Sequence, residues 1–418
     1  MRCFGSPAQT LDLSDSNGKH RQWTILLGDN GTGKTTLLEC LEAMTPDESS
    51  GLGIHSPRIA ETFIIDGRKW KLHKVVDNRI VFNMRLVLEV NQKAFQHTIF
   101  VTKNRHGSLH GGYNLYIAQN LVCFAYGASR QIGKTLLSGG ELISYRISFS
   151  DEFVLLNPEE WLLQADYAAS RDSEFKEKRK EELELVKRIL INTLPDVDDI
   201  RFAEKESGRT PQPIVEFHTH YGWVESKDLS LGYRTSMAWI VDFASRMFER
   251  YPESENPLEE PAIVLIDEID LHLHPKWQRD LIDYLTNLFP NTQFIVTTHS
   301  PLIVQAAAAR DANLVVLRRE GDHVVIDQSI EAVRGWRTDQ ILTSDLFDLP
   351  SARPKETEEL LEQRKQILSK AKLTKADEKK LKEISEKLGS LPVMENPEDD
   401  KAMDIIRRAA AHLQQEKR

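Results

Sequence analysis

The sequence predicts an α/β fold with a mixed central sheet, an antiparallel β lobe, a helical insertion and a C-terminal helical extension. Three observations lead to this class. Residues 22–44 have the pattern of a strand, a glycine-rich turn and a helix. Residues 262–300 hold two very apolar strands with a helix between them, which is typical of central parallel strands buried on both faces. From about residue 350 the chain becomes Lys- and Glu-rich helix.

Composition excludes several classes of protein. The chain has 418 residues, 40% hydrophobic and 28% charged, which is enough for one large core or two domains. The net charge of −10 excludes a uniformly basic nucleic-acid coat, although a local basic face remains open. Three cysteines without a CxxC pair exclude a disulfide framework, so we expect a reducing, cytoplasmic setting. The longest apolar run, residues 121–126, is far short of the roughly 18 residues of a membrane span, so we expect no membrane partner.

The elements follow one another along the chain. A strand over residues 23–27 precedes a helix that begins near Lys34. Short apolar runs in residues 60–105 predict a β-rich meander. Residues 156–195 have helical periodicity, with an apolar stripe made of Phe175, Leu183, Val186, Ile189 and Leu190.

The second half continues with a β-rich piece and then helices. Strands are expected around residues 200–202 and 214–217, and one long helix over 230–251. Residues 354–388 predict an antiparallel helical hairpin. Thr374 and Asp377 have the spacing of a capping box at the start of its second helix.

The strongest local motif is a complete GxxxxGK[ST] pattern from Gly28 to Thr35, between the first strand and its helix. Glycines let successive backbone N–H groups turn around a phosphate. Lys34 would neutralise the β- and γ-phosphates, and Thr35 would offer its hydroxyl to Mg²⁺. The strand–loop–helix context argues against a chance glycine-rich turn. The candidate phosphate-binding residues are Gly28, Asn30, Gly31, Gly33, Lys34, Thr35 and Thr36.

Two acids end the apolar strand over residues 263–266. Asp267 would hold Mg²⁺ through water, and Glu268 would polarise the water that attacks the γ-phosphate. The alternative, a solvated strand end, is weakened by the phosphate loop upstream. The next apolar strand is followed by His299, which could donate to the γ-phosphate or to the attacking water. A purely structural histidine is the alternative there.

A fourth motif, Leu229 to Arg234, stands before the long helix. Ser230 and Gly232 would present a hydroxyl and free N–H groups at the positive end of the helix dipole, which suits a phosphate. By itself this segment is also consistent with an ordinary N-cap.

The order of these motifs resembles the ATP-binding-cassette ATPases, and within them the non-transporter branch of RecF, SbcC-type, structural-maintenance-of-chromosomes and OLD ATPases. The stretches 266–278 and 294–301 are similar to ATPases of bacterial anti-phage systems, among them the ATPase subunit of Septu-type systems. Leu231 stands where transporters usually have glycine, which disfavours a transporter subunit. The resemblance implies an ABC-type head over residues 1–320, with an insertion over about 60–228, and a helical extension over 321–418.

The resemblance also implies a mechanism. Two heads would dimerise head to tail, or assemble further, and enclose two ATP molecules with Mg²⁺. Ser230 and Gly232 of one copy would complete the site of the other, and residues 270–275 would occupy the place of the D-loop. Gln131 is the candidate for the glutamine loop that contacts the metal.

Two functions remain open. The first is a regulator of a separate effector nuclease, of HNH type in a Septu-like system, since residues beyond 317 show no strand-borne carboxylate pair for an intrinsic nuclease. The second is a RecF-like ATPase that binds DNA in repair or recombination. Its basic residues could come from Lys178, Arg179, Lys180 and Lys187, or from a C-terminal lysine cluster. A solvated helix face with i,i+4 ion pairs is the alternative for both groups.

Overall fold

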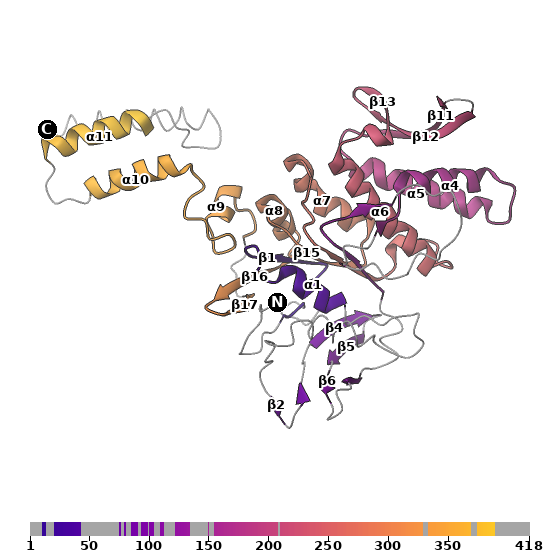
Figure 1. The fold of residues 1–418 in the computed structure, drawn as a ribbon, viewed down its shortest axis with the longest axis horizontal. Helices are drawn as coiled ribbons and strands as arrows, with labels where there is room; N and C mark the ends of the chain where they lie inside the picture. Colours follow the sequence, from indigo (N-terminus) through magenta and orange to yellow (C-terminus); the bar gives the residue numbers. More distant parts are fainter. Residues whose placement is uncertain are drawn as a thin grey trace. The chain divides into compact units, whose positions relative to one another are not determined.

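The computed structural model describes residues 11–13, 21–42, 122–133, 149, 154–207, 210–328, 333–368 and 374–388, together with the backbone of six short strands between residues 75 and 112. The chain forms two compact units, residues 1–348 and 349–418 (Figure 1). The head was expected to end at residue 320, but the strand that follows pairs with the sheet of the first unit. The first unit therefore continues to Asp348.

A six-stranded sheet forms the centre of the first unit. Its order is β17 (His323–Asp327), β16 (Asn313–Glu320), β1 (Trp23–Leu27), β15 (Thr292–Thr297), β14 (Ala262–Ile266) and β8 (Cys123–Tyr126). Five strands run parallel, and β17 adds an antiparallel edge. The predicted mixed sheet and its two apolar strands are confirmed, and both strands are buried along their whole length.

Helices cover both faces of this sheet. Side chains alternate along a strand, so Leu26 of β1 points to one face and Ile25 and Leu27 to the other. Leu26 packs with the leucines of α1 (Lys34–Glu42). The other two pack in the larger core with α6 (Leu231–Arg250), α7 (Pro275–Leu288) and α8 (Pro301–Ala309). α1, which follows the phosphate loop, thus covers one face of the sheet, and the long helix α6 packs on the other face.

A helical pair and a small sheet separate β8 from α6 in sequence. The short parallel pair β9 (Gln131–Ile132) and β10 (Val154–Leu155) precedes α4 (Pro158–Ser170) and α5 (Lys176–Thr193). The antiparallel sheet β11 (Asp199–Ser207), β12 (Thr210–Thr219) and β13 (Gly222–Glu225) follows. The predicted apolar stripe is confirmed for four of its five members, which are buried in α5. Phe175 is not part of it, because it lies before the first turn of α5 and is 59% exposed.

Five short strands lie inside the predicted β-rich stretch, and a sixth lies just beyond its end. They are β2 (Val75–Val76), β3 (Arg79–Ile80), β4 (Arg85–Val90), β5 (Lys93–Thr98), β6 (Phe100–Lys103) and β7 (Leu109–Gly112). They form three antiparallel pairs, β2–β3, β4–β5 and β6–β7. The expected antiparallel lobe is confirmed in the backbone.

The remaining helices are short or belong to the second unit. The first unit also contains the 3₁₀ turns η2 (Ser226–Asp228) and η3 (Pro257–Glu259), and α9 (Thr338–Leu342). In the second unit α10 (Lys355–Leu368) packs against α11 (Lys375–Leu388), as the predicted hairpin requires. The capping box is confirmed, because the Asp377 N–H donates to Thr374 Oγ1 at 3.2 Å and Asp377 Oδ2 accepts from the Thr374 N–H at 3.0 Å.

Candidate nucleotide-binding site

The carboxyl ends of three neighbouring strands bring the predicted motifs to one edge of the sheet. β1, β15 and β14 are adjacent and parallel, so their ends point the same way. The phosphate loop follows β1, His299 follows β15, and Asp267 and Glu268 follow β14. Ligands of open α/β sheets bind at such an edge.

The phosphate loop has the backbone that its glycines allow. Gly28, Gly31 and Gly33 have φ values of +140°, +80° and +89°, in the region that favours glycine. A Cβ at Gly28 would lie 2.4 Å from the carbonyl oxygen of Leu317 in β16, so the loop also needs glycine for close approach to the sheet. Around Gly31, no atom of the described residues other than its chain neighbours lies within 4 Å of such a Cβ. The loop is therefore closely held at its base and open at its tip, where Asn30 is exposed.

Lys34 lies across this loop. Its Nζ donates to the carbonyl oxygens of Gly28, at 2.7 Å, and Asp29, at 3.0 Å. Burial lowers the pKa of Lys34, while the charges of Asp267, Glu268 and Asp29 oppose that shift. The amine thus has neutral carbonyl partners that phosphate oxygens could replace. The neighbouring Thr36 is buried.

Asp267 joins the phosphate loop to the central strands. Its Oδ2 accepts from the hydroxyl of Thr35 at 2.8 Å, and its Oδ1 accepts from the hydroxyl of Thr297 at 2.6 Å. Thr297 Oγ1 in turn accepts from the backbone N–H of Glu268 at 2.7 Å. Two of the three side chains expected around Mg²⁺, Thr35 and Asp267, are therefore in direct contact. A hydroxyl and a carboxylate are oxygen donors of the kind that Mg²⁺ prefers, so the residues present fit the ion.

The other predicted residues lie around this contact. Glu268 is half-buried and has a φ of +50°, which is unusual for a residue with a side chain. His299 is exposed beyond the end of β15, and Gln131 is exposed in β9. The roles of these three residues stay predictions.

The segment Leu229–Arg234 packs against the expected D-loop of the same chain. Ser230 is the exposed N-cap of α6, and its side chain makes no capping bond within the described part of the chain. A Cβ at Gly232 would lie 2.3 Å from the carbonyl oxygen of His272, whose φ is +65°. Tyr233 packs on the Trp277 ring, with ring centroids 5.6 Å apart. Leu231 remains 52% exposed beside them.

Sequence reasoning missed two ionisable residues near Asp267 and Glu268, which are called the acid pair below. Arg130, directly before Gln131, is 5% exposed, and its guanidinium donates to backbone carbonyls of Asp267 and Glu268. Glu39, one turn after Thr35 in α1, has its pKa raised by burial and by Asp267. The only sequence signal for Arg130 is its position directly before Gln131, the candidate for the glutamine loop.

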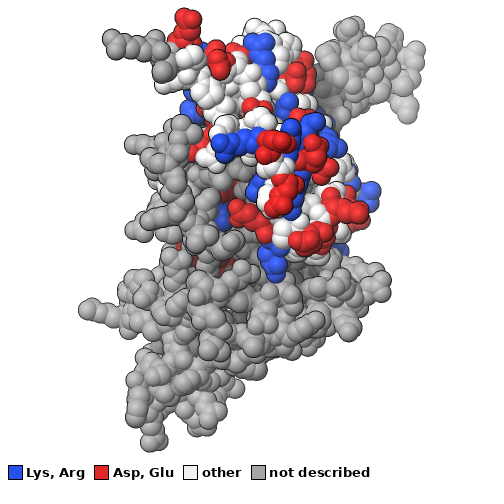
Figure 2. All heavy atoms as spheres, turned by 90° about the vertical axis from the view of Figure 1, so that its right-hand side faces the viewer, with Lys and Arg blue, Asp and Glu red and all other residues white. Residues whose placement is uncertain are grey.

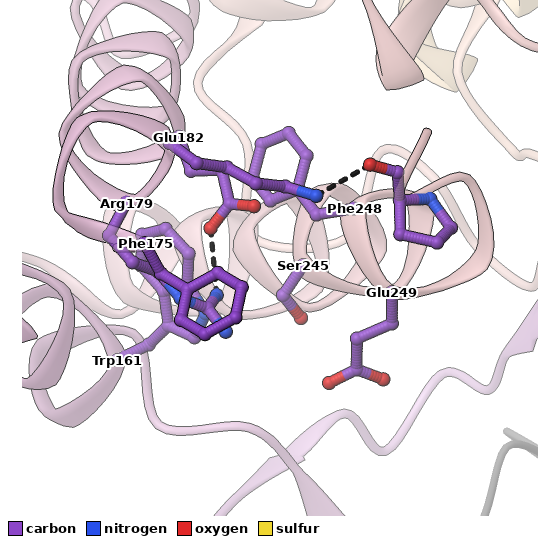
Figure 3. Close-up of a pocket in the computed structure, with 9 residues that line it drawn as sticks. Trp161, Phe175, Arg179, Glu182, Ser245, Phe248 and Glu249 are labelled. Atoms are coloured by element: carbon purple, nitrogen blue, oxygen red, sulfur yellow. Dashed lines mark hydrogen bonds and ion pairs between the residues drawn. The ribbon is translucent and has the colours of Figure 1, made fainter. Parts of the chain in front are cut away.

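A separate cavity of about 240 Å³ lies among α4, α5 and α6 (Figure 3). The aromatic rings of Trp161, Phe175 and Phe248 line it, and Arg179 Nη1 donates to Glu182 Oε2 at its rim at 2.7 Å. None of the residues predicted to bind nucleotide or metal lines this cavity, although Lys178 and Arg179 of the candidate basic face do. It is not part of the phosphate-binding edge.

Comparison with solved structures gives structural-maintenance-of-chromosomes heads. "Crystal structure of the SmcHead bound to the C-winged helix domain of ScpA" has a TM-score of 0.39 and 15% identity, and the match covers 73% of this chain and 89% of that one. "SMC head domain from Thermotoga maritima" has a TM-score of 0.38 and 14% identity, with 74% and 90% covered. Both scores are below 0.5, so the fold assignment rests on the strand order described above.

Comparison with curated proteins finds Septu proteins and a probable ATPase of a retron. "Septu protein PtuA" of Bacillus mycoides (strain KBAB4) is 27% identical over 90% of this chain and 48% of its own length. "Retron Ec83 probable ATPase" of Escherichia coli is 32% identical over 48% of this chain and 37% of its own length. "Septu protein PtuA" of Bacillus thuringiensis is 26% identical, and the match covers 79% of each chain. This chain thus spans about half the length, or less, of two of these three relatives.

These matches confirm the resemblance to Septu-type ATPases that the motifs predicted. The model of one protein family matches residues 24–305, which is more than half of the chain and includes the phosphate loop, the acid pair and His299. The chain belongs to this family, described as "AAA domain, putative AbiEii toxin, Type IV TA system".

Proposed function

We propose that this chain binds ATP with Mg²⁺ and hydrolyses it at the edge formed by β1, β15 and β14. The contact between Thr35 and Asp267, at 2.8 Å, carries the proposal, because it joins the phosphate loop to the carboxylate expected to hold the metal. When bound, Mg²⁺ neutralises charge on the β- and γ-phosphate oxygens. Family membership supports the same activity.

The side chains of the site have separate tasks in this proposal. Lys34 exchanges its two carbonyl partners for phosphate oxygens, since a bond between opposite charges is stronger than one to a neutral carbonyl. Glu268 orients the attacking water and accepts its proton. His299, exposed at the same edge, donates to the γ-phosphate, and Gln131 contacts the metal or the water.

We further propose that two copies close head to tail around the nucleotide. Ser230 is exposed at the start of a 20-residue helix, where unpaired N–H groups and the helix dipole favour an anion. Leu231 beside it is 52% exposed, so its side chain is available for contact with a second copy. Ser230 and Gly232 would then complete the site of the partner subunit, and higher assemblies could form from such dimers.

The biological role follows from the relatives. Septu and retron proteins match over much of the chain, so we propose a sensor or regulator in anti-phage defence that controls a separate effector nuclease of HNH type. No helix among the described residues is long and apolar enough to cross a membrane. A cytoplasmic location and the absence of a membrane partner stay predictions.

DNA binding is not favoured by the contacts of α5. Arg179 bonds to Glu182, and Lys187 lies 3.9 Å from Glu184. Lys178 donates to a backbone carbonyl at 2.5 Å. On the side of the molecule that carries α4 and α5, basic and acidic side chains are interleaved (Figure 2). Ion pairs therefore account for Arg179 and Lys187, and a backbone carbonyl for Lys178, so we do not propose a DNA-binding face there.

The variant Glu268→Gln tests the proposed hydrolysis and closure together. It should bind ATP with Mg²⁺ but release phosphate at least about 100-fold more slowly, because the group that accepts the proton of water is lost. The stalled protein should collect as ATP-dependent dimers, measured by size exclusion with light scattering. Hydrolysis at the native rate would show that Glu268 is not the base, and an ATP-bound monomer would contradict the dimer.

The effector is tested with the native operon. The chain and the products of the adjacent genes are expressed together and purified through a tag on the chain. A nuclease that copurifies, and a drop in phage plating that Lys34→Ala abolishes, are expected. A chain that elutes alone, with no nuclease gene beside its own, contradicts the proposed partner.

A further inference from the structure

A buried arginine contacts the acid pair from outside the recognised motifs. Arg130 lies between β8 and β9, is 5% exposed and has a φ of +35°. Its Nη2 donates to the carbonyl oxygen of Asp267 at 2.8 Å and to that of Glu268 at 2.6 Å. A single side chain thus bonds to the backbone at two consecutive residues of the proposed site.

These two carbonyls lie just beyond the regular pairing of the sheet. The last residue of β14 in register with β8 is Ile266, opposite Tyr126. The N–H of Asp267 still donates to the Tyr126 carbonyl at 2.8 Å, after which the chain turns at Glu268 with a φ of +50°. A residue with a Cβ has a steric cost in that conformation, so contacts from its surroundings must hold it there. Arg130 supplies two such contacts.

The charge of Arg130 also suits this place. Burial lowers its pKa to about 10, and the carboxylates of Asp267, Asp270 and Glu268 act in the opposite direction. The guanidinium is therefore a buried cation beside three acids of one short segment. Its Nε is buried without a hydrogen-bond partner among the described residues, so the side chain is placed by the Nη2 contacts and by charge.

We propose that Arg130 is a positioning residue that fixes the backbone of Asp267 and Glu268, so that the Glu268 carboxylate stands where the attacking water is held. This inference rests on the proposed ATPase function and deepens it. Arg130 touches no nucleotide in this scheme and acts through the acid pair. It also ties the strand that begins with Gln131 to the end of β14.

The test compares steady-state hydrolysis, ATP affinity and thermal stability in Arg130→Lys, Arg130→Gln and the wild type. A lysine keeps the positive charge, but its Nζ stands one bond closer to the backbone than the Nη2 that donates to both carbonyls, and it lacks the planar guanidinium. In a variant that melts within a few degrees of the wild type, kcat should fall about 10- to 100-fold, because displacement of a reacting group by about 1 Å costs that much. Affinity for fluorescent ATP should stay within about threefold, since the phosphate loop is untouched. Arg130→Lys should retain more activity than Arg130→Gln.

A matched control removes a surface arginine. Arg310, 40% exposed, pairs with Asp283 at 2.7 Å, and Arg310→Gln should leave kcat and ATP affinity unchanged. Three results overturn the inference: native kcat in both Arg130 variants, equal loss of kcat and ATP affinity, or failure of both variants to fold, which would make Arg130 a residue of the fold alone. A wild-type protein that neither binds nor hydrolyses ATP would instead remove the proposed function itself.

Discussion

The contact between Gly232 and His272 allows a quantitative test of the proposed interface. In Gly232→Ala the new Cβ would lie 2.3 Å from the His272 carbonyl oxygen, where 3.0 Å is the lower limit of real contacts, so backbone must move by about 0.7 Å. Overpacking of this kind costs about 1–3 kcal/mol. Alanine gains at most about 1 kcal/mol over glycine in a helix. The steric term is the larger over most of this range, and we expect a net loss of up to about 2 kcal/mol.

The assay measures stability and closure separately. Because the entropy of unfolding grows with chain length, a loss of that size should lower the melting temperature by up to about 3 °C in a unit of this length. Because the displaced segment includes the expected D-loop, ATP-dependent dimerisation in a Glu268→Gln background should weaken about tenfold or more.

A second glycine provides a control of similar thermodynamic cost. Gly321 in the β16–β17 turn has a φ of +63°, and a Cβ added there would have no atom within 4 Å. Gly321→Ala should cost about 1 kcal/mol through backbone strain alone and leave dimerisation unchanged. If Gly232→Ala melts at or above the wild-type temperature and dimerises normally, the packing of this glycine on His272 has no part in closure.

Two further substitutions test the site and the core. Lys34→Ala should abolish nucleotide binding in a fluorescent-ATP titration, because it removes the only lysine of the phosphate loop; wild-type affinity would contradict that role. Asp242→Asn should lower the free energy of unfolding by about 3 kcal/mol in urea titrations, since Asp242 is the buried acceptor for Arg246, at 2.7 Å, and for the Tyr126 hydroxyl, at 3.1 Å. A change below about 1 kcal/mol would show that this ion pair is not needed in the core.

Features encoded by neighbouring residues could be predicted from the sequence. The helix that begins at Lys34, the two buried strands and the capping box at Thr374 depend on spacings of a few residues, and all three are confirmed. The prediction that Phe175 belongs to the apolar stripe was wrong, because helical periodicity does not show where the helix starts. The residue stands one position before α5, so its side chain falls outside the buried stripe.

Contacts between distant segments could not be predicted in the same way. Arg130 lies 137 residues from Asp267, and their contact depends on the register of β8 against β14. Thr297 lies in the stretch 294–301 that carried the resemblance, but its bonds to Asp267 and Glu268 depend on the pairing of β14 with β15. Such contacts follow from strand order, which a single sequence does not specify.

The charges at this edge explain why the proposed mechanism needs a second copy for a stable nucleotide complex. Asp267, Glu268 and Asp270 face the cations Lys34 and Arg130, so acids already outnumber bases before a triphosphate adds its own negative charge. Burial makes that excess costly. Mg²⁺ would offset part of it, and the positive end of α6 from a second copy would offset more. ATP-driven closure should therefore require Mg²⁺ and weaken as salt screens the helix terminus.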